Sequence, residues 1–155
     1  MIKGLFETHL FVESLERSVN FYKNVLGLQQ CYYEAGRRAA FFWIGKPKEA
    51  MLGLWEKPKH EIQTMHFAFS CSVEDVLYNA ASFLKQRGLK PTNFLNDGTE
   101  RPMVFAWMPA LAIYFKDPDG HDLEFIAMLE GKERPALGVI SYEQWLEQIR
   151  NETNV

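Results

Sequence analysis

The sequence has little of what marks a membrane protein, a nucleic-acid-binding protein or a disulfide scaffold. No apolar run approaches the ~20 residues that span a bilayer. Lys and Arg number 17 against 20 Asp and Glu, a formal net charge of −3, which lacks the basic footprint of a nucleic-acid partner. The first residues, Met1–Glu7, become charged too early for a signal peptide. We therefore expect a cytoplasmic protein with neither membrane nor nucleic acid as a partner.

Cysteine is also scarce. The chain has two, Cys31 and Cys71, which stand in separate strand-like runs. Because we expect the protein to stay inside the cell, we interpret them as buried free thiols rather than a disulfide. What the chain does have is apolar residues, 47% of 155, which is enough for a packed core in one domain or in two small fused modules.

The clearest local pattern is the stretch 113–126, which predicts strand, turn, strand. Asp117-Pro118-Asp119-Gly120 carries turn chemistry, and β-branched and aromatic runs flank it. Glu124 follows inside the second apolar run. Two interpretations remain open: a carboxylate on the wet face of a strand, or a buried carboxylate that requires a partner.

Alternation and helical spacing predict the same element order twice. Ser14 and Ser72 are expected to cap helices that end at Gly27 and Gly88. A capping box at Ser141–Gln144 begins a last amphipathic helix. The expected strands are 5–13, 29–34, 38–44, 50–56, 64–71, 90–95 (weak) and 103–115, followed by the strand that ends at 126 after the turn above. Pro109 interrupts the run 103–115 and implies a bulge or an edge position there. The expected helices are 15–26 and 73–87.

The predicted fold is α+β. Two β-α-β-β-β modules, residues 1–57 and 64–128, form a cupped mixed sheet within a domain of residues 1–130, and residues 131–155 add a tail and helix. Laying one module on the other places His9 on His66, Phe42-Trp43 on Tyr114-Phe115, and Gly53 on Glu124.

The repeat gives four equivalent positions that could hold a metal ligand, and three of them carry metal-binding side chains: His9, His66 and Glu124. The fourth is Gly53. By alternation His9, His66 and Glu124 all lie opposite the apolar, helix-packed faces. Two histidines and one carboxylate with open positions form a recognised divalent-metal arrangement. Glu56 is a tempting further ligand, but it alternates with Leu54, so we expect it to be a solvated residue off the ligand face.

The chain resembles the vicinal oxygen chelate superfamily of glyoxalase I, bleomycin- and fosfomycin-resistance proteins and extradiol dioxygenases. The resemblance covers about residues 5–128 and rests on Ser18–Leu28 and Asp117–Glu124. It implies paired modules around a divalent ion, with the metal positions at His9, His66 and Glu124. Glyoxalase I has a fourth ligand where this chain has Gly53.

The resemblance implies an enzyme that acts on a small oxygenated substrate chelated to Zn, Ni, Mn or Fe, by lyase, isomerase or oxygenase chemistry. Glu124 and Tyr114 are the candidate catalytic residues, and Glu7 is a candidate base or partner of the metal ligands. The alternative is a binding protein of the bleomycin-resistance type that sequesters an antibiotic or metabolite. We expect a homodimer, because relatives often build sites across one.

Overall fold

The computed structural model describes residues 1–153 and divides them into two compact units. Unit 1 comprises Met1–Met65 with Asp117–His121, and unit 2 comprises His66–Lys116 with residues 122–153. The sequence boundaries at 57 and 64 are close to this division. Two segments join differently from the predicted modules: the turn at 117–121 belongs to unit 1, and the C-terminal tail belongs to unit 2.

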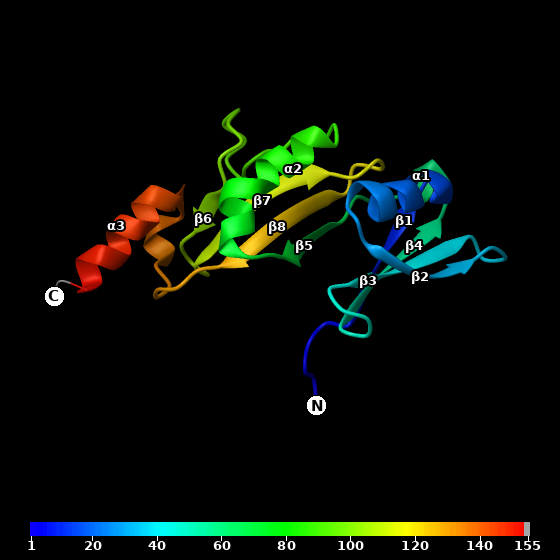
Figure 1. Ribbon diagram of the computed structural model, residues 1–155, viewed down its shortest axis with the longest axis horizontal. Helices are drawn as coiled ribbons and strands as arrows, with labels where there is room; N and C mark the ends of the chain where they lie inside the picture. The colour runs from blue at the N-terminus through cyan, green and yellow to red at the C-terminus, as the bar shows by residue number, and fades with distance from the viewer. Residues whose placement is uncertain (154–155) are drawn as a thin grey trace. The chain divides into compact units, whose positions relative to one another are not determined.

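Unit 1 is a four-stranded mixed sheet with one helix on its face (Figure 1). The strand order is β1-β4-β3-β2, with β1 parallel to β4 and the other pairs antiparallel. Its elements are β1 (Glu7–Val12), α1 (Leu15–Asn20), a π-helical turn (Phe21–Val25), β2 (Gln29–Glu34), β3 (Ala39–Ile44), β4 (Ala50–Glu56) and a 3₁₀ turn (Lys59–Glu61).

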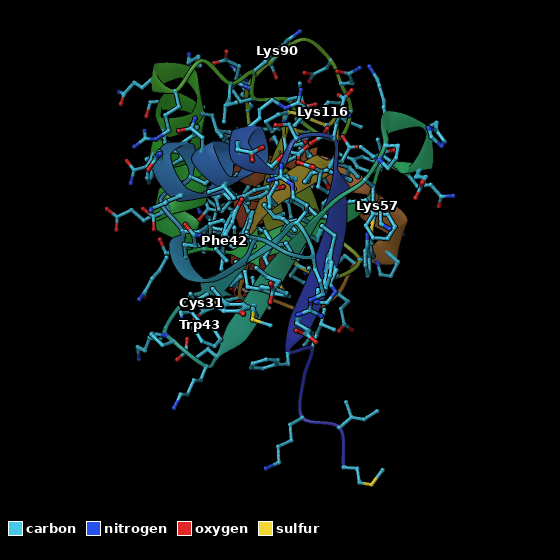
Figure 2. All side chains as sticks on the ribbon, turned by 90° about the vertical axis from the view of Figure 1, so that its right-hand side faces the viewer. Cys31, Phe42, Trp43, Lys57, Lys90 and Lys116 are labelled. Atoms are coloured by element: carbon cyan, nitrogen blue, oxygen red, sulfur yellow. The ribbon has the colours of Figure 1, made fainter. Side chains whose placement is uncertain are left out.

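The sheet of unit 1 buries the face that alternation predicted. Leu10 and Val12 are fully buried, as are Phe42 and Leu54, whereas Glu7 and Phe11 are exposed. Ser14 caps α1 by accepting a hydrogen bond from the N–H of Arg17. Figure 2 labels Cys31 and Trp43 at the same end of β2 and β3, where the pairing shifts by one residue at a bulge.

Unit 2 is a five-stranded mixed sheet of order β5-β8-β7-β6-β9. A π-helical turn and α2 pack against β7 and β8, and α3 packs against β9 and β6 (Figure 1). Its elements are β5 (His66–Ser70), the π-helical turn (Asp75–Asn79), α2 (Ala80–Gln86), β6 (Met103–Phe105), β7 (Ala110–Lys116), β8 (Asp122–Met128), a 3₁₀ turn (Pro135–Leu137), β9 (Val139–Ser141) and α3 (Tyr142–Thr153).

Two predictions in this unit were wrong. The run 103–115 is a hairpin of β6 and β7 joined by a tight turn at 106–109, rather than one strand with a bulge or an edge position at Pro109. The weak strand at 90–95 is a loop with a single bridge between Thr92 and Tyr114. Asn93 supplies the physical reason, because its side chain bonds to Asp97 and Thr99 within the loop rather than standing on a sheet.

The C-terminal helix belongs to the core of unit 2. Both hydrogen bonds of the predicted capping box form, Ser141 N–H to the Gln144 side chain and Gln144 N–H to the Ser141 hydroxyl. Trp145 is 1% exposed and packs with Val104 and Ala106. The strand β9 had no sequence prediction, and it covers the edge of β6 that would otherwise be open.

The turn 117–121 is held in unit 1 by buried polar groups. Asp117 accepts hydrogen bonds from the N–H groups of Asp119 and His121 and from the Tyr22 hydroxyl, 2.9 Å away. Burial raises the pKa of the Asp117 carboxyl, and burial also raises the pKa of Tyr22, with Asp117 adding to it. Removing either group would therefore leave a buried polar atom of the other without its hydrogen bond.

Tyr22→Phe is expected to lower the free energy of unfolding by about 1–3 kcal/mol, because a buried carboxylate oxygen loses its donor. Tyr33→Phe is the matched control: Tyr33 is 40% exposed, and its change should stay within about 0.5 kcal/mol. Urea denaturation of both variants measures this. Equal effects at the two positions would show that the bond to Asp117 does not stabilise the fold.

Candidate metal and substrate site

His66 and Glu124 lie together on adjacent strands of unit 2. Ala68 of β5 is the register partner of Glu124, and His66 stands two residues earlier on the same face. His66 Nε2 lies 3.0 Å from Glu124 Oε2. The structure thus brings together two of the three predicted metal ligands.

Glu124 is a buried carboxylate, the second of the two interpretations left open by the sequence. It is 4% exposed, and its Oε1 has no hydrogen-bond partner among the described residues. Burial raises its pKa, while the nearby His66 and Tyr114 act in the opposite direction. Burying a carboxylate oxygen without a hydrogen-bond donor carries a large desolvation penalty, which a bound cation would offset.

His66 is oriented as metal-binding histidines usually are. Its Nδ1 lies 3.1 Å from the carbonyl oxygen of Asp122, an acceptor that requires the proton on Nδ1. Its other ring nitrogen, Nε2, faces the Glu124 carboxylate. Backbone carbonyls commonly fix this tautomer in metal sites. The donor set of His66 and Glu124 therefore fits a divalent ion.

Tyr114, the second candidate catalytic residue, lies directly opposite Glu124 in the antiparallel ladder. Its ring centroid is 5.8 Å from that of His66. Burial, followed by the charge of Glu124, raises the pKa of Tyr114. The phenol therefore keeps its proton at neutral pH and acts as a hydrogen-bond donor at this site.

His9, the third predicted ligand, belongs to unit 1 and has its own partners there. Its Nδ1 accepts a hydrogen bond from the indole N–H of Trp55 at 3.3 Å, and its Nε2 lies 3.4 Å from Glu7 Oε2. Indole is only a donor, so this tautomer carries its proton on Nε2. Coordination through Nε2 would require the proton to move and the Trp55 bond to break.

Gly53 makes room for this imidazole. A Cβ on Gly53 would lie 2.7 Å from Cδ2 of His9 and 3.1 Å from its Nε2. Any side chain here, including the fourth ligand of glyoxalase I, would displace the ring from its present position. The glycine thus reflects a close approach across the sheet rather than a special backbone conformation.

The strand registers correct the sequence repeat. Gly53 pairs with Phe41 and with His9, whereas Glu124 pairs with Tyr114 and with Ala68. If Gly53 is the equivalent of Glu124, then His66 corresponds to Glu7 and Tyr114 to Phe41. The predicted equivalence of His9 with His66 was therefore wrong by two residues. The predicted equivalence of Phe42 with Tyr114 was wrong by one residue. A shift of two preserves the face, so alternation alone cannot reveal it.

Among residues 1–153, no group of three or more His, Cys, Asp or Glu side chains is close enough together to hold a metal ion. Glu7 and His9 share one face of β1 in unit 1, and His66 and Glu124 share one face in unit 2. Asn93 is a polar residue that sequence reasoning missed. The available signal was the polar, turn-rich run Asn96–Glu100 that follows it.

Glu56 lies off the ligand face, as alternation predicted, but it is not merely solvated. Its carboxylate accepts a hydrogen bond from the N–H of Leu15 at 2.8 Å and pairs with Arg38 at 2.6 Å. It therefore satisfies the N-terminus of α1. The hydrogen bonds from Arg38, and then that from Leu15, lower the pKa of Glu56.

Comparison with known proteins identifies the family. Residues 4–125 match the model of the Glyoxalase/Bleomycin resistance protein/Dioxygenase superfamily. This chain belongs to that superfamily. It is 28% identical over 143 residues to a lactoylglutathione lyase of Neisseria meningitidis serogroup A, covering 85% of this chain and 96% of the relative. It is 33% identical over 125 residues to the metallothiol transferase FosB of Lysinibacillus sphaericus, covering 74% of each.

Solved structures agree with the superfamily fold. An integron cassette protein from the mobile metagenome of the Halifax Harbour sewage outfall matches with a TM-score of 0.69 at 33% identity, covering 82% of this chain and all of that one. The fosfomycin resistance protein FosX of Mesorhizobium loti matches with a TM-score of 0.58 at 25% identity, covering 83% and 95%. No helix among the described residues is long and apolar enough to cross a membrane.

Glu56→Ala is expected to leave metal affinity unchanged and to lower the free energy of unfolding by about 1–2 kcal/mol at neutral pH. Because the folded pKa of Glu56 is lowered, its contribution is present above the ordinary value of 4.5 and lost as the pH falls through the folded pKa. The deficit of the variant should therefore shrink in acid.

Denaturation at pH 7 and pH 3, with metal titration at pH 7, measures both effects. Glu16→Ala is the control, since Glu16 also pairs with Arg38 but does not contact α1's first N–H. Glu16→Ala should lower the free energy of unfolding by less than Glu56→Ala does. A large drop in metal affinity for Glu56→Ala would mean that this carboxylate reaches the ion.

Proposed function

We propose that this protein is a divalent-metal-dependent enzyme of the superfamily that acts on a small oxygenated substrate. The observation that supports this most directly is the buried Oε1 of Glu124, which has no hydrogen-bond partner among residues 1–153 and belongs to the carboxylate that His66 Nε2 faces. His66 and Glu124 would supply two ligands for Zn, Ni, Mn or Fe. The bound ion would polarise neighbouring oxygen atoms of the substrate.

The protein's own residues define the rest of the chemistry. Tyr114 would donate a hydrogen bond to the Glu124 carboxylate or to a substrate oxygen, because its raised pKa keeps it protonated. Glu124 is the proposed site of proton transfer, because its carboxylate is held among Tyr114, His66 and apolar neighbours. Burial of these groups strengthens their electrostatic interactions.

A further ligand from β1 remains a proposal. The sequence pattern favours His9. The strand register favours Glu7, the position that corresponds to His66, and a carboxylate is an equally good ligand for these ions. In its present tautomer His9 suits the role of a partner that hydrogen-bonds to Glu7.

His66→Ala is expected to reduce divalent-metal affinity by at least about tenfold, because it removes a direct ligand. Isothermal titration with Zn²⁺, Mn²⁺ and Ni²⁺ measures this, alongside elemental analysis of protein purified without chelator. His60→Ala is the matched control, since His60 is an exposed histidine of the 3₁₀ turn Lys59–Glu61. Glu7→Ala and His9→Ala in the same titration decide between the two β1 candidates.

Unchanged affinity in His66→Ala would overturn the metal proposal. Protein that takes up no divalent ion but still binds small organic ligands would instead support the sequestering function of the bleomycin-resistance type, since sequestration alone needs no metal.

We also propose a homodimer in which metal sites draw ligands from both chains. Light scattering at micromolar concentration should give twice the chain mass. Mixing His9→Ala or Glu7→Ala chains with Glu124→Ala chains should then restore part of the metal binding lost in each. Mixing His66→Ala with Glu124→Ala should restore none, because those two ligands lie together in one chain. A clean monomer that retains its metal would contradict shared sites.

A further inference from the structure

Unit 2 contains a pocket of about 500 Å³ next to the proposed metal ligands. His66 and Tyr114 form part of its wall, and the loop after α2 contributes Asn93 and Phe94. A cavity of this size accommodates a small organic molecule. Its polar groups and charges restrict what that molecule can be.

Asn93 presents a buried acceptor with no donor. The residue is 4% exposed, and its Nδ2 donates to Asp97 Oδ1 at 2.8 Å and to Thr99 Oγ1 at 3.0 Å. These bonds hold the Nδ2 side of the amide towards Asp97 and Thr99. Within residues 1–153, Oδ1 has no hydrogen-bond partner. A buried acceptor of this kind carries a desolvation penalty that a ligand O–H or N–H would relieve.

Phe94 places an aromatic ring at the same pocket. It is 57% exposed, although its ring centroid lies 5.0 Å from that of Phe105 and 6.5 Å from that of Tyr114. An aromatic side chain held by neighbouring rings, yet more than half open to solvent, offers a preformed contact for a planar ligand. Tyr114, one of the rings next to Phe94, is also the residue of β7 that lies opposite Glu124 of β8.

The pocket carries no unpaired basic side chain among its described lining residues. Lys116, labelled in Figure 2, forms an ion pair with Asp122 at 2.6 Å, and Asp122 lines the same pocket. The remaining lining groups apart from His66 are amides, hydroxyls and aromatic rings. A phosphonate or carboxylate would therefore lack a counter-ion here, whereas a neutral ring would not need one.

We propose that this pocket is a subsite for a neutral aromatic group bearing an O–H or N–H donor, which Asn93 Oδ1 accepts while the ring packs on Phe94 and Tyr114. The assignment deepens the proposed function, because it names the substrate class for the site of His66 and Glu124. It does not depend on a bound metal. Phe94 and Asn93 are binding residues in this scheme and take no part in the chemical step.

The test compares phenol with anisole by NMR titration of ¹⁵N-labelled protein in EDTA, so that no metal contributes. Anisole keeps the ring and replaces the O–H by a methoxy group. Phenol should shift the side-chain amide of Asn93 and bind roughly fivefold to tenfold more tightly than anisole, as expected for one buried hydrogen bond. Phenylphosphonate, which carries the ring and an anion, should bind more weakly than phenol.

Phe94→Ala should weaken phenol binding by roughly threefold to tenfold through loss of the aromatic contact. Leu95→Ala is the matched control, because Leu95 is 50% exposed on the same loop and does not line the pocket. It should leave phenol affinity unchanged. Both side chains are solvent-exposed, so both variants are expected to fold.

Equal affinity for phenol and anisole, tighter binding of phenylphosphonate, or an unchanged affinity in Phe94→Ala would each overturn the subsite. So would the absence of phenol binding at 20 mM, roughly the weakest affinity that one stacked ring and one hydrogen bond would give. None of these outcomes bears on metal affinity, which the His66→Ala titration measures separately, so the two proposals fail independently.

Discussion

The hydrogen bonds that hold the turn 117–121 in unit 1 are the constraint on which the rest of the structure depends. Asp119 accepts from the N–H of Glu13, the guanidinium of Arg17 and the Ser18 hydroxyl. His121 is fully buried, with its Nδ1 accepting from the N–H of Met65 and its Nε2 next to the carbonyl oxygen of Phe11. The two stretches that carry the family resemblance, Ser18–Leu28 and Asp117–Glu124, thus meet in one network.

The same turn determines where the candidate site forms. β8 begins at Asp122, immediately after the turn, and its register with β7 places Glu124 opposite Tyr114. The parallel pairing with β5 then brings His66 to the same carboxylate. Burying Glu124 is costly, and its unpaired oxygen is the kind of feature that folding alone would not favour. Asn93 Oδ1 is the second such atom, in the adjoining pocket. Among residues 1–153, these two buried atoms without hydrogen-bond partners occur where ligand binding is proposed.

Local sequence chemistry was sufficient to predict most of the elements. Ser14, Ser72 and the Ser141–Gln144 box cap helices because their hydroxyls satisfy free N–H groups that neighbouring residues supply. Alternation assigned the buried faces of β1 and β4 correctly. The hairpin of β6 and β7 and the strand β9 could not be predicted in this way. Their formation depends on which distant strand offers an open edge, and β9 pairs with a segment more than 30 residues earlier in the chain.

The sequence by itself determined the α+β order, the faces of the strands and the identity of His66, Glu124 and Tyr114 as candidates, because these follow from periods and caps that act over a few residues. Only the tertiary structure decided the register between strands. A shift of two residues leaves every side chain on the same face, so the pairing of Glu7 rather than His9 with the position of His66 required the hydrogen-bonded ladders. The tertiary structure also decided which polar atoms have partners: Glu56 pairs with Arg38 and Leu15, whereas Glu124 Oε1 has no hydrogen-bond partner in the described part of the chain. Burial and partnership of that kind are properties of the assembled chain.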